Sequence, residues 1–365
     1  MPFYIGLMSG TSADGIDASL VGFSPEMQPA EHYFLEFSAQ LKQQIVSLYQ
    51  ATDNEIIRTG LLANELAHLY AKAVKALLAK SNIDSSQINA IGCHGQTIRH
   101  CVDLSSPFSV QICNYALLAE LTGIDVIGDF RSADIAAGGQ GAPLVPAFHQ
   151  QILPPANQPQ VLLNIGGIAN LSLFDETGKL LGAYDTGPGN ALLDDWINLQ
   201  QQKAYDKNGE WAAQGRVSEP LLQKLLNDLY FVKAPPKSTG REYFNLAWLQ
   251  TKLANFDINA VDVQRSLLQL TCVTIAQEIA AKIKHGNVWV CGGGAHNKAL
   301  LASLQQALGD RFTIASSAAV KIDPDWVESQ CFAWLAYCFR EKITANLPQV
   351  TGARKTKVLG CLYPA

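Results

Sequence analysis

The chain has 365 residues, of which 48% are hydrophobic and 16% charged, and its formal net charge is −5. This length predicts about two compact domains, and the acidic balance argues against nucleic acid or an anionic membrane as the main partner. No lysine or arginine precedes Lys42, so a secretory signal is not expected, and no apolar run is long enough to span a bilayer. We therefore expect a cytoplasmic protein.

Cysteine and histidine spacing argues against a disulfide framework or a structural metal. The eight cysteines include no Cys-x-x-Cys pair, and the seven histidines form no spacing typical of metal ligands. Several cysteines lie inside apolar stretches, as Cys291 does after Val288-Trp289-Val290. Reduced thiols buried in a core are the expected outcome.

The first informative segment is a hairpin pattern. A strand pattern over 3–7 leads into a turn of Gly, Ser and Thr, and a second strand pattern covers 16–23. Glycine at 6, 10 and 15 lets backbone N–H groups approach an anion, and the hydroxyls of the turn add donors. Such a hairpin can bind a polyphosphate, although a single turn of this kind is equally consistent with a hairpin that binds nothing.

The rest of the first half alternates helix and strand. Leucines at helical spacing predict a helix over 60–80, and a short buried strand over 88–92 follows it and ends at Cys93-His-Gly-Gln-Thr97. Residues 114–122 are predicted to be helical and to stop at Gly123, before a strand over 125–128.

The second half repeats this order with insertions. Residues 163–174 again form strand, glycine turn and strand, around Gly166-Gly167. Asn259 is expected to cap a long amphipathic helix that closes at Gly286, and a strand over 288–290 then ends at three glycines. A duplicated α/β fold with one glycine hairpin in each half indicates a nucleotide held between two lobes. P-loop, Rossmann and protein-kinase signatures are absent.

Several motifs in order resemble those of the anhydro-N-acetylmuramic acid kinase family, which belongs to the actin, sugar-kinase and chaperone-ATPase superfamily. The matching segments span nearly the whole chain. They are Gly6–Asp17, Gly92–Thr97, Asp129-Phe130-Arg131 with Asp134, Gly138–Pro146, Asn164–Leu171, Asp185–Asn190, Gly292–Asn297 and Glu328–Ala336.

The resemblance implies a fold and a reaction. The fold is a two-lobed, duplicated ribonuclease-H-like (actin-like ATPase) architecture with a central cleft for nucleotide and substrate. The reaction is ATP-dependent phosphorylation of 1,6-anhydro-N-acetylmuramic acid while water opens the anhydro bridge. Its products are N-acetylmuramate 6-phosphate and ADP, as part of peptidoglycan recycling. The alternatives are a conformational ATPase of the actin or chaperone type, or another small-sugar kinase on this fold.

The expected nucleotide site draws on three glycine-rich segments. The first hairpin should hold the β- and γ-phosphates, the second should offer backbone donors, and the last three glycines should lie against the adenosine, although a plain tight turn is also consistent with these three. The expected ATP-binding residues are Gly10, Thr11, Ser12, Ala13, Asp14, Gly15, Ile16, Asp17, Gly166, Gly167, Gly292, Gly293, Gly294 and Asn297.

Asp185 is the expected catalytic base. It ends a strand-like segment over 181–184 just before a glycine turn, where a carboxylate can reach a bound water or hydroxyl. The sequence Asp-Thr-Gly also suits a simple turn. By resemblance, Asp185 activates the water that attacks the anomeric carbon.

The expected substrate-binding residues follow strands in the first half or begin a late helix, and each has a structural alternative. Arg131 could bind the lactyl carboxylate of the sugar or pair with Asp129 or Asp134. The alternative role for His94 is a buried position in the core. The alternative for Glu328 is a favourable interaction of its charge with a helix N-terminus. The full set is His94, Gln96, Thr97, Arg131, Asp134 and Glu328.

Two positions depart from the superfamily pattern. Met8 and Asn164 stand where relatives usually carry an acid that organises Mg²⁺. Asp14, Asp17 or Asp185 could take over that task. ATP and Mg²⁺ are the expected cofactors, with the metal held largely by the phosphates.

The lobes are expected at 1–130 with 346–365, and at 131–345 with the insertions. The resemblance suggests a homodimer, to which the apolar helices at 267–283 and 329–339 could contribute, although both also suit the core.

Overall fold

The computed structural model describes residues 2–23 and 27–365, which divide into two compact units. Unit 1 runs to Phe148 and resumes at Trp326, and unit 2 is His149–Asp325. Residues 131–148 and 326–345 therefore belong to unit 1, whereas the lobes expected from sequence place them in the second lobe. In the described part of the chain, no helix is both long and apolar enough to cross a membrane.

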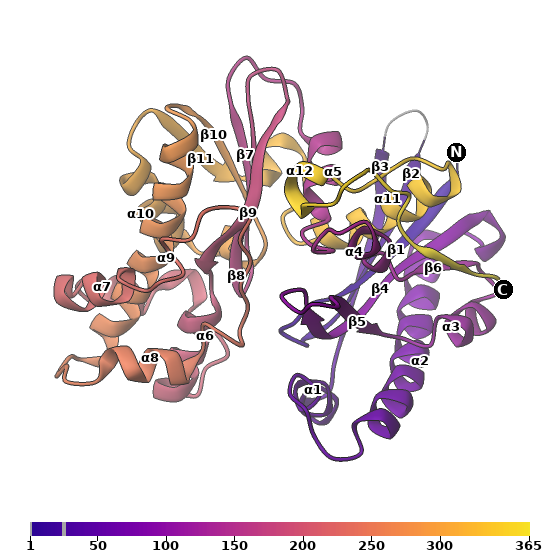
Figure 1. The fold of residues 1–365 in the computed structure, drawn as a ribbon, viewed down its shortest axis with the longest axis horizontal. Coiled ribbons are helices and arrows are strands. Elements are labelled where there is room, and N and C mark those ends of the chain that lie inside the picture. Colours follow the sequence, from indigo (N-terminus) through magenta and orange to yellow (C-terminus); the bar gives the residue numbers. More distant parts are fainter. Residues whose placement is uncertain (1, 24–26) are drawn as a thin grey trace. The chain divides into compact units, whose positions relative to one another are not determined.

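Unit 1 is built on a seven-stranded mixed sheet (Figure 1). Its strand order is β12-β6-β4-β1-β2-β3, and β5 pairs with β4. The first two pairs, β1–β2 and β2–β3, are antiparallel, whereas β4 runs parallel to β1 and to β6. The strands are β1 Phe3–Ser9, β2 Gly15–Phe23, β3 Met27–Glu36, β4 Ile88–Cys101, β5 Phe108–Ile112, β6 Val126–Gly128 and β12 Cys361–Tyr363.

Unit 2 repeats the same topology on a five-stranded sheet. Its order is β11-β10-β7-β8-β9, with β7–β8 and β8–β9 antiparallel and β10 parallel to β7 and β11. The strands are β7 Gln160–Ile165, β8 Ile168–Phe174, β9 Leu180–Pro188, β10 Gly286–Cys291 and β11 Phe312–Ser316. Counted in chain order, the strands β1–β4 and β6 of unit 1 and the five strands of unit 2 share the order 3-2-1-4-5, whereas β5 and β12 are additions to unit 1. This order is that of the ribonuclease H fold, so the expected duplication is confirmed.

Helices cover both sheets. The helices are α1 Ala39–Val46, α2 Glu55–Ser81, α3 Tyr115–Thr122, α4 Ser132–Ala136, α5 Val145–Ile152, α6 Ala191–Gln201, α7 Glu219–Leu226, α8 Leu246–Leu253, α9 Ala260–Lys282, α10 Lys298–Leu308, α11 Val327–Arg340 and α12 Pro348–Thr351. Short 3₁₀ turns lie at Ser85–Gln87, Lys207–Gly209, Ala212–Gln214, Gly293–His296 and Ser317–Val320.

In unit 1, the two faces of strand β1 pack against different helices. Ile5 and Leu7 belong to the buried cluster that includes Leu66 and Tyr70 of α2. Gly6 faces the other way, because successive side chains alternate across a strand, and it meets the backbone of α11. In unit 2, α9 packs on β8 and β9 and joins α7 and α10 in one buried apolar cluster.

Glycines in β1 and β4 allow α11 to approach the sheet closely. A Cβ on Gly6 would overlap the carbonyl oxygen of Ser329, and a Cβ on Gly92 would overlap that of Phe332. Both obstacles are backbone atoms of one helix, which cannot move aside as a flexible side chain can. These glycines therefore set the distance between α11 and the two central strands.

Three predicted elements have different ends in the structure. Strand β4 continues to Cys101 because β5 provides an antiparallel partner for Gln96–Cys101, so the predicted end near residue 92 is wrong. Strand β9 continues to Pro188 because β8 pairs with it as far as that residue. Helix α9 ends at Lys282, and Gly286 begins β10 rather than closing the helix.

Two further predictions concern helix ends. Helix α3 ends at Gly123 with a left-handed φ of 64°, as predicted. Asn259 stands at the N-cap position of α9, but its side chain makes no capping hydrogen bond. Asn297, expected as an ATP-binding residue, caps α10 by accepting from the Leu300 N–H. All eight cysteines are free thiols, five of them buried.

Replacing Gly92 by alanine is expected to destabilise unit 1 by about 1–3 kcal/mol, because the added Cβ must push α11 away from the sheet. Thermal or urea unfolding measures the change. Gly60, in the interior of α2 with open space around it, provides the matched control. Gly60→Ala should instead stabilise the protein by about 1 kcal/mol. Equal effects of both substitutions would contradict the close approach of α11.

Candidate functional site

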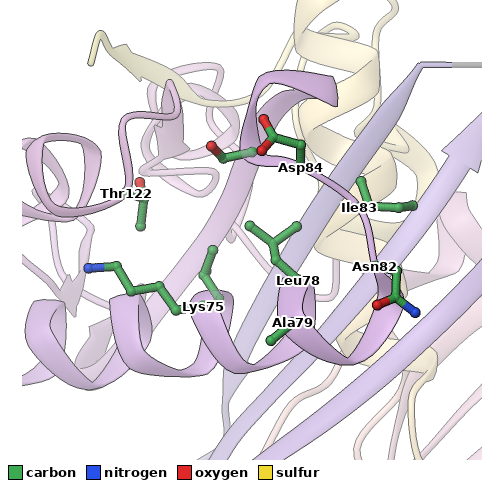
Figure 2. Close-up of a pocket in the computed structure, with 9 residues that line it drawn as sticks. Lys75, Leu78, Ala79, Asn82, Ile83, Asp84 and Thr122 are labelled. Carbon is green, nitrogen blue, oxygen red and sulfur yellow. The ribbon is translucent and has the colours of Figure 1, made fainter.

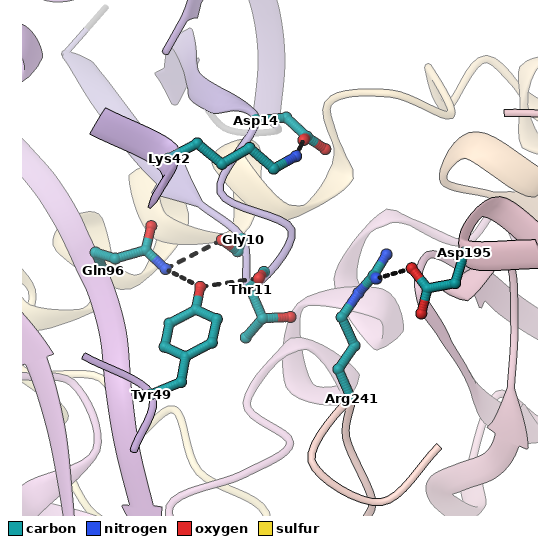
Figure 3. A network of polar contacts seen from close by, with 8 residues as sticks. All are labelled: Gly10, Thr11, Asp14, Lys42, Tyr49, Gln96, Asp195 and Arg241. Atoms are coloured by element: carbon teal, nitrogen blue, oxygen red, sulfur yellow. Dashed lines mark hydrogen bonds and ion pairs between the residues drawn. The ribbon is translucent and has the colours of Figure 1, made fainter. Parts of the chain in front are cut away.

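The first glycine turn, between β1 and β2, is fastened by Gln96 (Figure 3). The Gln96 amide donates to the Gly10 carbonyl at 3.1 Å and to the Tyr49 hydroxyl at 3.2 Å. Its oxygen accepts from Ser9 Oγ at 2.5 Å, and Tyr49 in turn donates to the Thr11 carbonyl at 2.8 Å. Gln96 is buried and its polar atoms are engaged with the turn, so it positions the hairpin.

Side chains in this turn divide into exposed and buried sets. Thr11 and Asp14 are exposed, Ser12 is partly exposed, and Asp14 pairs with Lys42. Ala13, Gly15 and Ile16 are buried, so these three of the expected ATP-binding residues can offer a ligand only their backbone. Ala13 has a φ of 50°, and its N–H donates to the Gly10 carbonyl at 3.1 Å, which closes the turn.

Asp17 lies directly opposite Met8 in the register of β1 and β2. Opposite residues of an antiparallel pair project from the same face, with Cβ atoms about 5 Å apart. Asp17 therefore places a carboxylate beside the position where superfamily members carry their acid. Asp14 lies in the turn outside the paired register, and its partner is Lys42.

His94, Arg131 and Glu328 form a second group in unit 1. Arg131 Nη2 donates to His94 Nε2 at 2.8 Å, and Nη1 donates to the Gly141 carbonyl at 2.6 Å. Burial and the Arg131 charge keep the pKa of His94 well below its usual range, so the ring is neutral and carries its proton on Nδ1. Burial raises the pKa of Glu328, and the charge of Arg131 opposes that rise.

Thr97 and Asp134 occupy structural positions near this group. Thr97 Oγ1 accepts from the Gln111 amide at 3.2 Å across β4 and β5. Asp134 is completely buried, and it accepts from the Asn346 amide at 2.6 Å, the Thr351 hydroxyl at 2.8 Å and the Gly141 N–H at 2.8 Å. Both Asp134 oxygens thus accept hydrogen bonds within the protein, and the substrate contact expected from sequence stays a prediction.

The second glycine turn joins β7 to β8 and is fastened to the beginning of α6. The N–H groups of Asn190 and Ala191 donate to the carbonyls of Gly166 and Gly167 at 2.8 and 3.0 Å. The Arg241 guanidinium lies against this turn, because its Nε is 3.3 Å from the position of a Cβ on Gly167. Arg241 Nη1 is 3.1 Å from an oxygen of Asp195 on α6 (Figure 3).

Gly292–Gly294 pack on the end of β7. Gly292 has a φ of +73°, and a Cβ there would overlap the side-chain oxygen of Asn164. A Cβ on Gly294 would press on the Ile165 side chain. Asn297 is buried as the cap of α10. Close packing accounts for Gly292 and Gly294. In the part of the chain that the structure describes, the nearest atom to a Cβ on Gly293, apart from its chain neighbours, is the Asn190 amide nitrogen at 3.8 Å.

Asp185 lies within β9 in a row that crosses the sheet of unit 2. Asn164 pairs with Asn170, and Asn170 pairs with Asp185. Asp185 Oδ2 accepts from the Thr239 N–H at 2.9 Å, and its own N–H donates to the Lys237 carbonyl at 3.2 Å. Burial raises the pKa of Asp185 to about 7, opposed by the Thr239 hydrogen bond.

The segment 237–242 is the part of the site that sequence reasoning missed. Lys237 and Thr239 hold Asp185 through backbone groups, and Arg241 lies at the second glycine turn. The run Lys-Ser-Thr-Gly-Arg-Glu combines hydroxyl, glycine and cationic residues. That composition was the available signal, but nothing local connects the segment with a strand more than fifty residues earlier.

A surface pocket of unit 1 lies elsewhere (Figure 2). It is lined by the C-terminal half of α2, the residues that follow it and the end of α3, including Lys75, Leu78, Asp84 and Thr122. None of the residues singled out from the sequence lines it.

Comparison with known proteins gives one consistent family. The model of the family described as anhydro-N-acetylmuramic acid kinase matches residues 2–365. A protein of that name from Nitrosomonas europaea is 48% identical over 365 residues, covering 100% of both chains. One from Shewanella amazonensis is 48% identical over 364 residues, covering 99% of this chain and 98% of its own.

Similarity to solved structures is more distant. An activator of 2-hydroxyisocaproyl-CoA dehydratase from Clostridium difficile, with bound ADPNP, is 10% identical with a TM-score of 0.49, covering 93% of this chain and 96% of its own. A likeness at that level has no bearing on function.

Replacing Asp134 by alanine is expected to destabilise the protein by about 3–5 kcal/mol, because three buried donors lose their acceptor. Chemical unfolding measures this, with the exposed Glu176→Ala as the control. A variant with unchanged stability and a raised KM for sugar would instead favour the substrate contact expected from sequence.

Proposed function

Because the chain belongs to the anhydro-N-acetylmuramic acid kinase family, we propose that it uses ATP to phosphorylate 1,6-anhydro-N-acetylmuramic acid as water opens the anhydro bridge. The products are N-acetylmuramate 6-phosphate and ADP. The family match over the whole chain supports the identity of the substrate. The observation that supports the reaction is the Asp185 carboxylate, which accepts from a backbone N–H and has a pKa of about 7.

Asp185 is the proposed general base. A base works best when its pKa lies near the working pH, and burial brings this carboxylate there. It removes a proton from water as the water oxygen bonds to the anomeric carbon. The bond from that carbon to the bridge oxygen breaks, and the bridge oxygen takes the terminal phosphoryl group of ATP, which releases ADP.

The glycine turns are proposed to bind the nucleotide. Among the described residues, and apart from the chain neighbours, the nearest atom to a Cβ on Gly10 is Ser12 Oγ at 3.8 Å, and the nearest to a Cβ on Gly166 is the Ile168 carbonyl oxygen at 3.7 Å. Both turns therefore have room for phosphate oxygens. Thr11 and Ser12 add exposed or partly exposed hydroxyls. Gly293 is proposed to lie against the adenosine, and Asn297 contributes by fixing the start of α10.

Arg131 and Glu328 are the proposed contacts to the sugar, with Arg131 on its carboxylate. The neutral His94 ring accepts from one edge of the guanidinium and so orients it. Asp134, through Gly141, holds the loop whose carbonyl also binds Arg131. Gln96 acts through the first glycine turn, and Thr97 stays a proposed contact.

Magnesium is proposed to bind with the phosphates of ATP. In the described residues, no group of three or more Asp, Glu, His or Cys side chains could by itself hold a metal ion. That observation fits Mg²⁺, which commonly uses one or two carboxylates together with phosphate oxygens and water. Asp17, opposite Met8, is the proposed carboxylate. When bound, the ion neutralises charge on the transferred phosphoryl group.

Three further expectations concern the alternative function, the oligomeric state and the location in the cell. The conformational ATPase is not favoured, because the full-length relatives are named as kinases. The homodimer and the cytoplasmic location stay predictions.

Asp185→Asn is expected to lower kcat by about 10²- to 10⁴-fold, because the base can no longer take a proton. In the wild type, kcat/KM should rise with pH and level off above about 7, where Asp185 is ionised. The assay follows ADP and sugar 6-phosphate together, with and without the anhydrosugar. ATP hydrolysis that needs no sugar and survives Asp185→Asn would contradict the proposed function.

Unfolding of the same variant provides an independent check. The pKa of Asp185 is about 7 when folded and about 4 in an unfolded chain. Asp185 therefore destabilises the folded state progressively as pH rises from 4 through 7. Asp185→Asn should be more stable than the wild type at pH 8, and the difference should vanish near pH 4.

Asp17→Asn is expected to raise the Mg²⁺ concentration needed for half-maximal activity by about tenfold or more. Binding of Mn²⁺–ADP, followed by electron paramagnetic resonance, should weaken in parallel. Asp14→Asn is the matched control, because Asp14 lies in the same hairpin but in the turn outside the register that places Asp17 opposite Met8. A larger effect of Asp14→Asn would transfer the role to that residue.

A further inference from the structure

Arg241 lies at the second glycine turn of unit 2, and the proposed reaction assigns it no role. Its guanidinium lies against the Gly166–Gly167 turn, with Nε 3.3 Å and Nη2 3.7 Å from the Cβ position on Gly167. Asp195 accepts from Nη1 at 3.1 Å. The side chain is 31% exposed, so it remains open to solvent on part of its surface.

The segment that carries Arg241 also holds Asp185. The Thr239 N–H donates to the Asp185 carboxylate, and the Lys237 carbonyl accepts from the Asp185 N–H. Lys237 is in turn buried and paired with Glu278 at 2.7 Å, which anchors the segment on α9. Since consecutive Cα atoms are about 3.8 Å apart, Arg241 begins within roughly 8 Å of the residue that binds the base.

We propose that Arg241 binds the terminal phosphoryl group of ATP at the Gly166–Gly167 turn and stabilises the charge that it carries during transfer. This inference rests on the proposed function, in which the phosphoryl group moves to the bridge oxygen of the sugar and Asp185 activates the water that attacks the anomeric carbon. The bond from terminal phosphorus to ADP breaks and a bond to the bridge oxygen forms. Arg241 stays protonated throughout.

The chemistry of the side chain fits this task. A guanidinium presents parallel N–H donors to two oxygens at once and stays charged at any relevant pH. Arginines placed on a transferred phosphoryl group contribute much of the rate in other phosphotransferases.

Asp195 fits the role of an orienting partner. Both members of the pair are partly exposed, 31% for Arg241 and 27% for Asp195, so the interaction is weak. A phosphate oxygen can therefore compete for the guanidinium. Lys42 at the first turn differs, because it pairs with the more exposed Asp14 and its ammonium offers no parallel donors.

The test compares Arg241→Met, Arg241→Lys and a matched control, Arg340→Met. Arg340 pairs with Asp125 at 30% exposure of both side chains, and it lies in unit 1 at the end of α11, near the beginnings of β4 and β6. The measurements are kcat, the KM for ATP, thermal unfolding, and binding of ADP and of β,γ-methylene-ATP, both with Mg²⁺.

Arg241→Met should lower kcat by about 10²- to 10³-fold. It should weaken the affinity for β,γ-methylene-ATP by about tenfold and leave the affinity for ADP within about twofold of wild type. Only β,γ-methylene-ATP has the terminal phosphate that Arg241 would contact. Arg241→Lys should recover part of kcat. Arg340→Met should leave kcat and both affinities unchanged. Equal losses for ADP and β,γ-methylene-ATP, or no loss of kcat, would overturn the proposal.

The outcomes also separate this inference from the proposed function. Wild-type turnover of the anhydrosugar with no effect of Arg241→Met would overturn the inference alone. The opposite result is also possible: the wild type does not phosphorylate the anhydrosugar, yet Arg241→Met selectively weakens the binding of β,γ-methylene-ATP. That result would overturn the proposed function and leave the phosphate contact supported.

Discussion

The parallel pairing of the first and fourth strands of each sheet determines where the site residues lie. In unit 1, Ser9 at the end of β1 pairs with Gln96 of β4, so the Gln96 side chain reaches the turn that follows. In unit 2, Asn164 pairs with Cys291, which brings the next glycine against the end of β7. Because parallel strands end at the same edge, each glycine turn has a second, distant segment to hold it.

Duplication of the fold did not duplicate the chemistry. The row that crosses the sheet of unit 1 runs from Met8 to Asp17, whereas the equivalent row of unit 2 runs from Asn164 through Asn170 to Asp185. The acid thus stands on the second strand in one unit and on the third strand in the other. One topology thus places two carboxylates at neighbouring steps of equivalent rows. The carboxylate in unit 1 is the one proposed to bind a metal ion, and the carboxylate in unit 2 is the one proposed as general base.

Local patterns in the sequence predicted the elements better than their ends or their partners. The hairpin at 3–23 and the end of helix α3 at Gly123 follow from short-range rules, and both predictions are confirmed. The end of β4 depended on pairing with β5, which no local pattern reports. The glycine turns were likewise found from composition. The hydrogen bonds that Thr239 donates to Asp185 and Thr351 donates to Asp134 join segments far apart in the chain, so the roles of these residues could be found only from the fold.

Buried polar groups explain how exposed turns keep a fixed shape. Gln96 and Asp134 are fully buried, and each forms hydrogen bonds with several partners outside its own strand or helix. Breaking such a group leaves buried donors without acceptors, so the bonded arrangement is strongly favoured. Asp185 is the opposite case, because burial with a single backbone donor raises its pKa and destabilises its ionised form. The free-energy cost of ionising buried Asp185 is tolerated because hydrogen-bonded polar groups elsewhere stabilise the fold around it. The same desolvation raises the pKa, so the carboxylate can accept a proton near neutral pH.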